Sequence, residues 1–328
     1  MKHPKLVILT EQSDKSADLV CQWLYHWGYD FLRFNEDKSV NPVVKVSFEN
    51  GENTTTLRVH GEEFLLTGIP KTWFRRGFVK CVSVGNVPNL SNETNKSIER
   101  HLENEGKTLE DFLYFILGRS QGINHPNCYN YNKLIALFEA QKVGFHIPPT
   151  LLSVDAQHLK QFVEMQRACI SKSIQDLMGI AVNDLYAYTG KTVRVNADDI
   201  HPQGHWYSLF QREITKKYEI RVFYFLRKIY AMAIFSQLDK DSILDFREVD
   251  VNGSHPNRMV PFVLPNHITQ KVRKLMKMLK LESGSLDFIV TPDNEYYFLE
   301  VNPVGQFNFV SEICNYHIEK HIAKTLSS

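Results

Sequence analysis

The segment from Leu286 to Pro303 restricts the fold of this chain more than any other stretch of the sequence. Two runs of apolar, β-branched and aromatic residues flank a Pro-Asp-Asn turn, which is typical of a β-hairpin. A two-residue loop at 293–294 places Asp287 directly opposite Glu300 in the predicted register. Asn302 then lies on the same face as both carboxylates, because side chains along a strand alternate between its two faces.

The two faces of this predicted hairpin differ in chemistry. One is apolar, with Phe288 expected opposite Leu299, and the other carries the facing carboxylates of Asp287 and Glu300. At about 5 Å and an effective dielectric constant of about 20, two such charges repel by about 3 kcal/mol. A divalent cation removes this repulsion, and the carboxylates and Asn302 supply the hard oxygen ligands that Mg²⁺ prefers. A solvated hairpin end without a metal is the alternative that this segment alone leaves open.

The composition excludes several classes of protein. Hydrophobic residues make up 43% of the 328 residues and charged residues 23%, which is ordinary for a globular protein with two or three packed units. A net charge of +1 favours neither nucleic acid nor an anionic membrane, and no apolar run approaches the ~18 residues of a membrane span. The five cysteines are scattered, as is typical of reduced thiols. We therefore expect a cytoplasmic protein without nucleic-acid or membrane partners.

The N-terminal third of the sequence predicts an α/β unit. The apolar run 5–10 predicts a strand, Ser13 or Ser16 is expected to cap the following helix, and 29–34 predicts a second, parallel strand. Further expected elements are short strands at 43–48, 54–60 and 63–66, and a polar loop at 84–110 leading into a helix near 109–117. The Gly/Asn/Pro-rich segment 119–131 then predicts a domain boundary.

Hydrophobic periodicity predicts the elements after that boundary. They are a helix opening at Asn132, a helix at 156–166, a strand at 168–173, a strand pair within 186–196, a strand at 208–214, a hairpin at 218–225 and 229–235, a helix at 268–279 and a closing helix at 318–326.

Several common catalytic motifs are absent from the sequence. Gly190-Lys191-Thr192 lacks the first glycine of a phosphate-binding loop, because Leu185 takes that place, and there is no GxSxG, HRD or GxGxxG motif. What remains is an ordered series that comprises Lys133, Lys172, residues 211–214, Glu219, Arg221, Arg247, Asp287, Glu300 and Asn302. A lone lysine at the end of a strand is usually a solvated surface group, so the order of the whole series carries the argument.

In its order and spacing this series resembles the ATP-grasp superfamily, over roughly residues 120–328. The resemblance implies two lysines on the nucleotide phosphates, a hinge strand that binds adenine through its backbone, an acidic residue at the ribose and an Asp…Glu-x-Asn set for Mg²⁺. In that order the matching residues are Lys133 and Lys172; Gln211, Arg212, Glu213 and Ile214; Glu219; and Asp287, Glu300 and Asn302. Arg212 departs from the family, which has an acidic residue directly after the glutamine, but backbone contacts to adenine tolerate this change.

Three further segments, Leu299–Phe307, Trp73–Arg76 and Phe246–Arg247, resemble one branch of the superfamily, the maturases of microviridin-type peptides (graspetides), especially its grasp-with-spasm group. Phe246 stands where tryptophan is commoner. The N-terminal strand-helix-strand ending at 31–35 extends the resemblance to nearly the whole chain. The implied fold class is α/β (α+β), an ATP-grasp fold with three domains. They are an N-terminal α/β pre-ATP-grasp domain at 1–118, a lysine-bearing subdomain at 119–206 and a C-terminal subdomain with the metal site at 207–328.

The resemblance implies ATP- and Mg²⁺-dependent coupling of Asp or Glu carboxylates of a ribosomally made precursor peptide, leader plus core, to Ser/Thr hydroxyls or Lys amines through an acyl phosphate. Arg247 and Arg221 are the candidate catalytic residues, Arg247 at the γ-phosphate and Arg221 at the acceptor carboxylate. Arg75 and Arg76 are candidates for binding the same carboxylate, with a structural ion pair as an equal alternative. A ligase of free amino acids or protein termini, a non-catalytic nucleotide-dependent peptide-binding module and a homodimer stay open.

Overall fold

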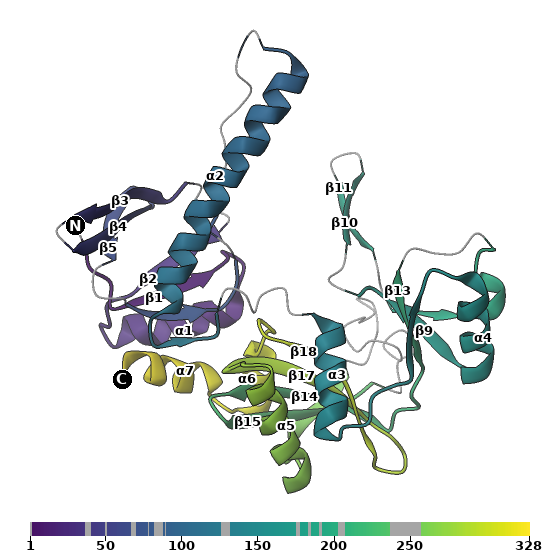
Figure 1. Ribbon diagram of the computed structural model, residues 1–328. Coiled ribbons are helices and arrows are strands. Elements are labelled where there is room, and N and C mark those ends of the chain that lie inside the picture. Colours follow the sequence, from purple (N-terminus) through teal and green to yellow (C-terminus); the bar gives the residue numbers. More distant parts are fainter. Residues whose placement is uncertain are drawn as a thin grey trace. The chain divides into compact units, whose positions relative to one another are not determined.

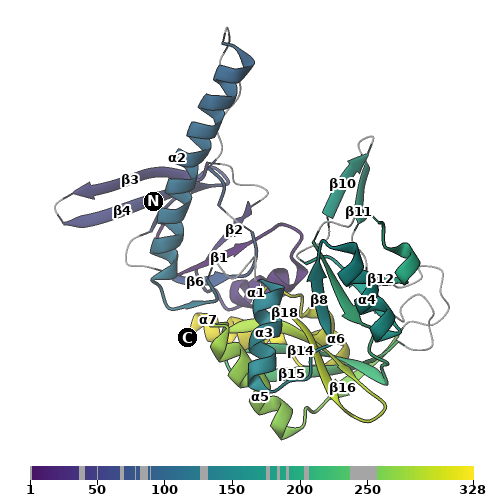
Figure 2. The ribbon, with the colours of Figure 1, turned by 45° about the vertical axis from the view of Figure 1, so that its right-hand side comes forward.

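The computed structural model describes residues 2–36, 41–49, 51–66, 70–77, 79–81, 88, 90–125, 132–174, 178–182, 185–189, 192–202, 207–236 and 257–328. The chain divides into two compact units (Figure 1, Figure 2). Unit 1 comprises Met1–Tyr129, Pro303–Ser311 and His317–Ser328, and unit 2 comprises Asn130–Asn302 and Glu312–Tyr316. The expected mixed α/β fold class is confirmed in both. No helix in the described part of the chain is long and apolar enough to cross a membrane.

Unit 1 is built on a parallel sheet with the strand order β2-β1-β6-β7. Its strands are β1 (Leu6–Thr10), β2 (Leu32–Asn35), β6 (Lys71–Phe74) and β7 (Gly122–Ile123). Helix α1 (Lys15–His26) connects β1 to β2, which confirms the predicted strand-helix-strand unit. The predicted cap is wrong, because Asp14, and neither Ser13 nor Ser16, accepts the first N–H groups of the helix. A carboxylate at this position also interacts favourably with the helix dipole.

An antiparallel sheet and two further helices complete unit 1. The sheet contains β3 (Val43–Glu49), β4 (Glu52–Val59) and β5 (Glu62–Leu66), as expected. Helix α2 (Asn92–Gly118) begins well before the predicted loop ends, so the expectation of a loop up to 110 is wrong. Ser91 caps α2, while Leu113 and Leu117 anchor only its C-terminal end in the core, so the first part is a polar helix without a buried stripe. Helix α7 (Ile318–Ser327) packs against α1.

Unit 2 contains an antiparallel sheet with the order β12-β9-β13-β8. Its strands are β8 (Thr150–Ser153), β9 (Cys169–Lys172), β12 (Val193–Val195) and β13 (Ser208–Arg212), and helix α4 (Ala156–Gln166) covers one face. The short helix η3 (Ala197–Asp199) follows β12. The predicted strand pair within 186–196 is wrong, because β11 (Leu185–Thr189) pairs with β10 (Met178–Val182) upstream and β12 pairs with β9. The prediction relied on Thr189-Gly190 as the turn, whereas the Asn-Asp dipeptide before Leu185 is a turn signal of the same kind for the upstream pairing.

The second sheet of unit 2 is antiparallel, with the order β16-β15-β14-β17-β18. Its strands are β14 (Tyr218–Phe225), β15 (Lys228–Phe235), β16 (Arg258–Phe262), β17 (Ser283–Val290) and β18 (Tyr296–Asn302). Helix α3 (Lys133–Val143) begins where the sequence predicts, with Asn132 as its cap, and packs against β18 and α5 (Asn266–Met278). Helix α6 (Asn308–Cys314) follows β18 in the chain. Phe145, just after α3, contacts Phe288 and Phe298, so this face of the sheet is apolar.

The hairpin of β17 and β18 has a different loop and register from those predicted. The loop is Pro292-Asp293-Asn294, with Asn294 in the left-handed conformation (φ 61°). This longer loop pairs Phe288 with Phe298, so the predicted pairing with Leu299 is wrong. A β-bulge next to this pair then restores the predicted register, in which Asp287 faces Glu300. The predicted pair of carboxylates is therefore confirmed, because the bulge cancels the shift that the loop introduces.

Candidate functional site

A row of charged side chains crosses neighbouring strands of the second sheet in unit 2. Arg221 of β14 lies opposite Asp287 of β17, and Asp287 lies opposite Glu300 of β18. The Nη1 atom of Arg221 is 2.8 and 2.6 Å from the two carboxylate oxygens of Asp287, and both side chains are nearly fully buried. The facing carboxylates therefore share their face with a guanidinium group that holds one of them in place.

Lys133 and Asn302 extend this row. The Nζ atom of Lys133, the first residue of α3, lies 3.7 Å from Oε2 of Glu300. Asn302 lies on the same side of β18 as Glu300, opposite Ser285 of β17. The structure thus brings together all the candidate metal ligands and one of the two candidate phosphate-binding lysines.

The oxygen chemistry of this face fits Mg²⁺. Asp287, Glu300 and Asn302 offer carboxylate and carboxamide oxygens, which Mg²⁺ takes together with oxygens of substrate phosphates. A buried hydroxyl without a hydrogen-bond partner in the described structure, that of Ser285, lies on the same face. Among the described residues no group of three or more His, Cys, Asp or Glu side chains could hold a metal ion.

The candidate adenine-binding hinge lies at the end of β13. The N–H groups of Arg212 and Glu213 donate to the carbonyl groups of Pro149 and Ala168, each at 3.0 Å. The N–H of Ile214 has no backbone acceptor within the described part of the chain. Among the described residues, Ile214 is therefore the member of this segment whose N–H lacks a backbone acceptor, and it stays the candidate donor to adenine.

Gln211 carries a hydrogen-bond acceptor with a fixed orientation beside this hinge. The hydroxyl of Thr150 donates to the Pro148 carbonyl at 2.7 Å, so it can only accept from Nε2 of Gln211, at 2.9 Å. The NH₂ end of the Gln211 carboxamide is therefore directed to Thr150, and the other end, the acceptor Oε1, points away from it. Oε1 is buried without a hydrogen-bond partner among the described residues. Register places Gln211 and Lys172 on one face of their sheet, away from Phe210 and the cluster under α4.

Glu219 is buried on β14, two positions before Arg221 and on the same face. Its carboxylate accepts a hydrogen bond from the hydroxyl of Ser236 at 2.9 Å and pairs with the ammonium group of Lys216. Burial raises the pKa of Glu219, whereas Lys216 and Ser236 oppose this rise. The candidate ribose-binding carboxylate therefore already has partners from the chain itself.

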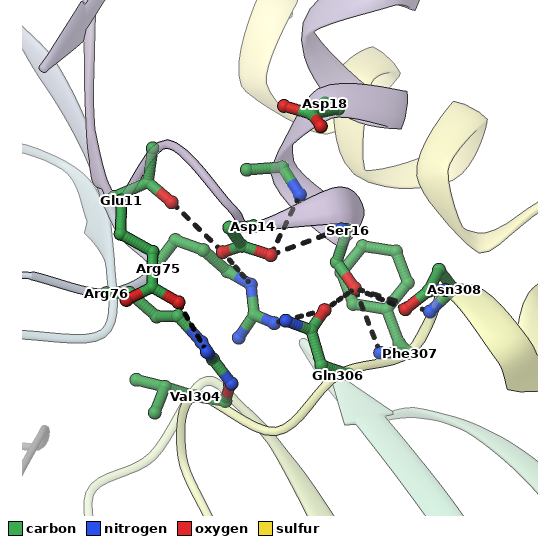
Figure 3. A network of polar contacts seen from close by, with 12 residues as sticks. Glu11, Asp14, Ser16, Asp18, Arg75, Arg76, Val304, Gln306, Phe307 and Asn308 are labelled. Atoms are coloured by element: carbon green, nitrogen blue, oxygen red, sulfur yellow. Dashed lines mark hydrogen bonds and ion pairs between the residues drawn. The ribbon is translucent and has the colours of Figure 1, made fainter. Parts of the chain in front are cut away.

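Arg75 and Arg76 belong to a network of polar contacts within unit 1 (Figure 3). The guanidinium of Arg75 pairs with Asp14 at 3.1 Å, and their side chains are only 4% and 0% exposed. Arg76 pairs with Glu11 at 2.7 Å and donates to the Val304 carbonyl at 3.2 Å. Both arginines thus form ion pairs within the chain, which is the alternative that the sequence left open. Their binding of a substrate carboxylate stays a prediction.

Arg247, the other candidate catalytic arginine, lies outside the described residues. Two polar residues of these faces, Ser285 and Thr150, were not identified from the sequence. Extending the predicted strand by one residue could have found Ser285, because it precedes Asp287 by two positions and so lies on the same face. Thr150 carries no such signal, since its contact with Gln211 joins strands that are far apart in the sequence.

Solved structures match this chain over its full length, whereas no family model and no curated protein matches the sequence. A RiPP-associated ATP-grasp ligase from Chryseobacterium gregarium, in complex with ADP and a leader and core peptide, is 27% identical, with a TM-score of 0.80 over 100% of this chain and 96% of that chain. The macrocyclase MdnC from Microcystis aeruginosa MRC, bound with the precursor peptide MdnA, is 23% identical, with a TM-score of 0.77 over 98% of both chains. MdnB from the same organism is 24% identical, with a TM-score of 0.74 over 98% of this chain and 99% of that chain. The resemblance found in the sequence is therefore confirmed, and this chain has the ATP-grasp fold of the RiPP-associated ligases.

Proposed function

We propose that this chain is an ATP-dependent ligase that joins Asp or Glu side-chain carboxylates of a ribosomally made precursor peptide to Ser or Thr hydroxyls or Lys amines, and so forms macrocycles. The observation that carries the proposal is the match of the whole chain to a ligase solved with ADP, a leader and a core peptide. Because that match includes unit 1 as well as the nucleotide-binding candidates of unit 2, it supports a shared class of substrate and not only a shared nucleotide.

The residues proposed to hold the nucleotide and its metal all lie in unit 2. They are Lys133 and Lys172 for the phosphates, the backbone of 211–214 for adenine, Glu219 for the ribose, and Asp287, Glu300 and Asn302 for Mg²⁺. When bound, Mg²⁺ neutralises charge on the phosphate oxygens during phosphoryl transfer. Arg221 is positioned on the same face, where it fixes the Asp287 carboxylate.

The chemistry needs an activated carboxylate, because an unactivated carboxylate would have to expel oxide. A carboxylate oxygen of the peptide attacks the γ-phosphorus of ATP, the bond to the β,γ-bridging oxygen breaks, and ADP leaves behind an acyl phosphate. The hydroxyl or amine then attacks the acyl carbon, phosphate departs with the bonding electrons, and the proton of the nucleophile passes to phosphate or solvent. The chain's task is to position and to neutralise charge. A thiol nucleophile is not required, and burial raises the pKa of Cys169 to about 11.

Mass spectrometry of a candidate precursor tests this proposal. The full-length protein with ATP, Mg²⁺ and a peptide encoded beside its gene is expected to remove one water from the peptide for each bond formed, and to release ADP and phosphate in equal amounts. Reactions without ATP, and with Lys172→Ala, serve as controls. ATP turnover with free amino acids and an unchanged peptide would favour the amino-acid ligase instead. Binding of peptide and nucleotide without hydrolysis would favour the non-catalytic module.

A further inference from the structure

Ser285 is a buried hydroxyl that the proposed chemistry does not use. It lies on β17 between Phe223 of β14 and Asn302 of β18, and it precedes Asp287 by two positions on the same face. Its side chain is 1% exposed, and its Oγ atom has no hydrogen-bond partner among the described residues. Burial of a hydroxyl without a partner is unfavourable, so such an atom beside a candidate metal site indicates a role that begins when the site is filled.

Asn302 is the residue directly opposite Ser285 in the strand pair. Facing side chains have Cβ atoms about 4.5–5.5 Å apart, which allows a hydroxyl and a carboxamide to form a hydrogen bond. Asn302 is also the candidate ligand with two chemically different ends. A carboxylate such as Glu300 offers an oxygen in either orientation, whereas a turned carboxamide offers an NH₂ group that repels a cation. Asn302 therefore needs an orienting group that the acidic ligands do not need.

We propose that Ser285 is a positioning residue that orients Asn302 for cation binding. When the site is filled, its Oγ accepts a hydrogen bond from Nδ2 of Asn302, which leaves Oδ1 as the atom offered to the cation. Asp287 does not need this hydroxyl, because Arg221 already donates to both of its oxygens. The inference rests on the proposed Mg²⁺ site and adds the residue that determines which end of Asn302 is a ligand.

Ser285→Ala in the full-length protein tests this role. With ADP bound and Mn²⁺ as the probe, electron paramagnetic resonance titration is expected to show at least about tenfold weaker Mn²⁺ binding than in the wild type. The Tm of the variant is expected to stay the same or to rise, because alanine removes a buried hydroxyl that had no partner. Ser283→Ala is the matched control. Ser283 is buried on the same face of the same strand but lies beyond the last residue pair of β17 and β18, so Mn²⁺ affinity is expected to be unchanged.

A double-mutant cycle separates orientation of Asn302 from a general distortion of the sheet. Asn302→Asp places a carboxylate at this position, and either of its two oxygens can bind a cation. Ser285→Ala is therefore expected to have no effect on Mn²⁺ affinity in that background. Equal affinities of wild type and Ser285→Ala would overturn the inference while leaving the metal site in place. An equally large effect of Ser285→Ala in the Asn302→Asp background would also overturn it. If Mn²⁺ binding to the wild type does not saturate, and Glu300→Gln gives the same titration, the proposed metal site is wrong. The role proposed for Ser285 is then wrong as well.

Discussion

Each unit contains a buried arginine paired with an aspartate, but the surroundings of the two pairs differ. In unit 1, one oxygen of Asp14 accepts the N–H groups of Ser16 and Ala17, and the other accepts from the Thr10 hydroxyl and pairs with Arg75 (Figure 3). Both oxygens of this carboxylate therefore find their donors within the unit itself. A buried charge supplied with donors in this way stabilises the native fold, and it offers no position to a ligand.

In unit 2, the pair of Arg221 and Asp287 lies beside a second carboxylate, that of Glu300, and beside the Ser285 hydroxyl, which has no partner in the described structure. A buried polar network that the chain does not complete is unfavourable until a ligand completes it. The comparison therefore predicts a structural role for the Asp14 carboxylate, whose two oxygens both have donors, and a binding role for the face around Asp287.

Glu300→Gln is the variant with the largest expected effect. It keeps the size of the side chain but removes the negative charge that faces Asp287, so the site loses a charged ligand for Mg²⁺. Peptide-dependent ATP turnover, measured as phosphate release, is expected to fall by about a hundredfold to a thousandfold. The Tm is expected to change little. Turnover at the wild-type rate would contradict the metal site and remove the functional difference between the two units.

Arg75→Ala is expected to have the next largest effect, on stability. The variant leaves Asp14 buried without its guanidinium partner and removes the contact of Arg75 with the Phe307 ring, 5.7 Å away. Removing one partner of a buried ion pair costs about 3–5 kcal/mol. Urea unfolding followed by tryptophan fluorescence is expected to show a much lower midpoint, since the buried Trp73 reports on unit 1.

Arg58→Ala is the matched control for this measurement. Arg58 pairs with Glu63 at 2.7 Å, but both side chains are exposed, so the loss is expected to stay below about 1 kcal/mol. A larger loss of stability in Arg58→Ala than in Arg75→Ala would contradict the structural role of the buried pair in unit 1. If Arg75→Ala unfolds like the wild type yet no longer modifies peptide, the substrate-binding role predicted for Arg75 is correct.

Gln211→Leu is expected to weaken ATP binding by roughly tenfold, which corresponds to the loss of about one hydrogen bond. The Oε1 atom of Gln211 is an acceptor, which suits the amino group of adenine but not the carbonyl oxygen of guanine. Isothermal titration with ATP and GTP checks this. Thr150→Val removes the hydroxyl that orients the carboxamide, so it is expected to reduce the preference for ATP while Gln211 is retained. An unchanged preference in both variants would contradict contact between Gln211 and the base.

The polar face around Asp287 could be predicted because strand periodicity is a local rule. It places Glu300 and Asn302 on one side of their strand whatever the partner strand does. Asp287 faces Glu300 only because the bulge offsets the longer loop. The bulge lies beside Phe298, which is fully buried, and no local pattern in the sequence reveals it. The N-terminal part of α2 is missed for a related reason, since its residues 92–108 carry no apolar stripe.

Contacts that join distant parts of the sequence could not be predicted. The partner of Arg75 is Asp14, and the group that orients Gln211 is Thr150, in each case on an element placed by the fold. Sequence alone therefore left Arg75 open between an ion pair and a substrate ligand. Residue type and order were sufficient to identify the ATP-grasp resemblance, because the chemistry of nucleotide binding restricts which side chains can appear in that series.

The smallest expected effect concerns Glu219. Burial raises its pKa, so the folded protein binds this proton more tightly than the unfolded chain does. The stability that the proton contributes is fully present below about pH 4 and is lost as the pH rises through the folded pKa. Relative to Glu219→Gln, the wild type is therefore expected to lose stability from about pH 4 upward, which urea midpoints over this range measure. A gain of wild-type stability with rising pH would contradict burial as the main cause.

Ser236 and ADP are expected to move this pH dependence in opposite directions. Ser236→Ala removes a hydroxyl that bonds to the Glu219 carboxylate, so it raises the pKa further and shifts the loss of stability to higher pH. Ribose hydroxyls that donate to Glu219 would add hydrogen bonds to the charged form and lower the pKa. The affinity for ADP, measured by titration calorimetry, is then expected to rise with pH in the wild type relative to Glu219→Gln. Parallel profiles would instead group Glu219 with Asp14, as a carboxylate that serves the fold alone.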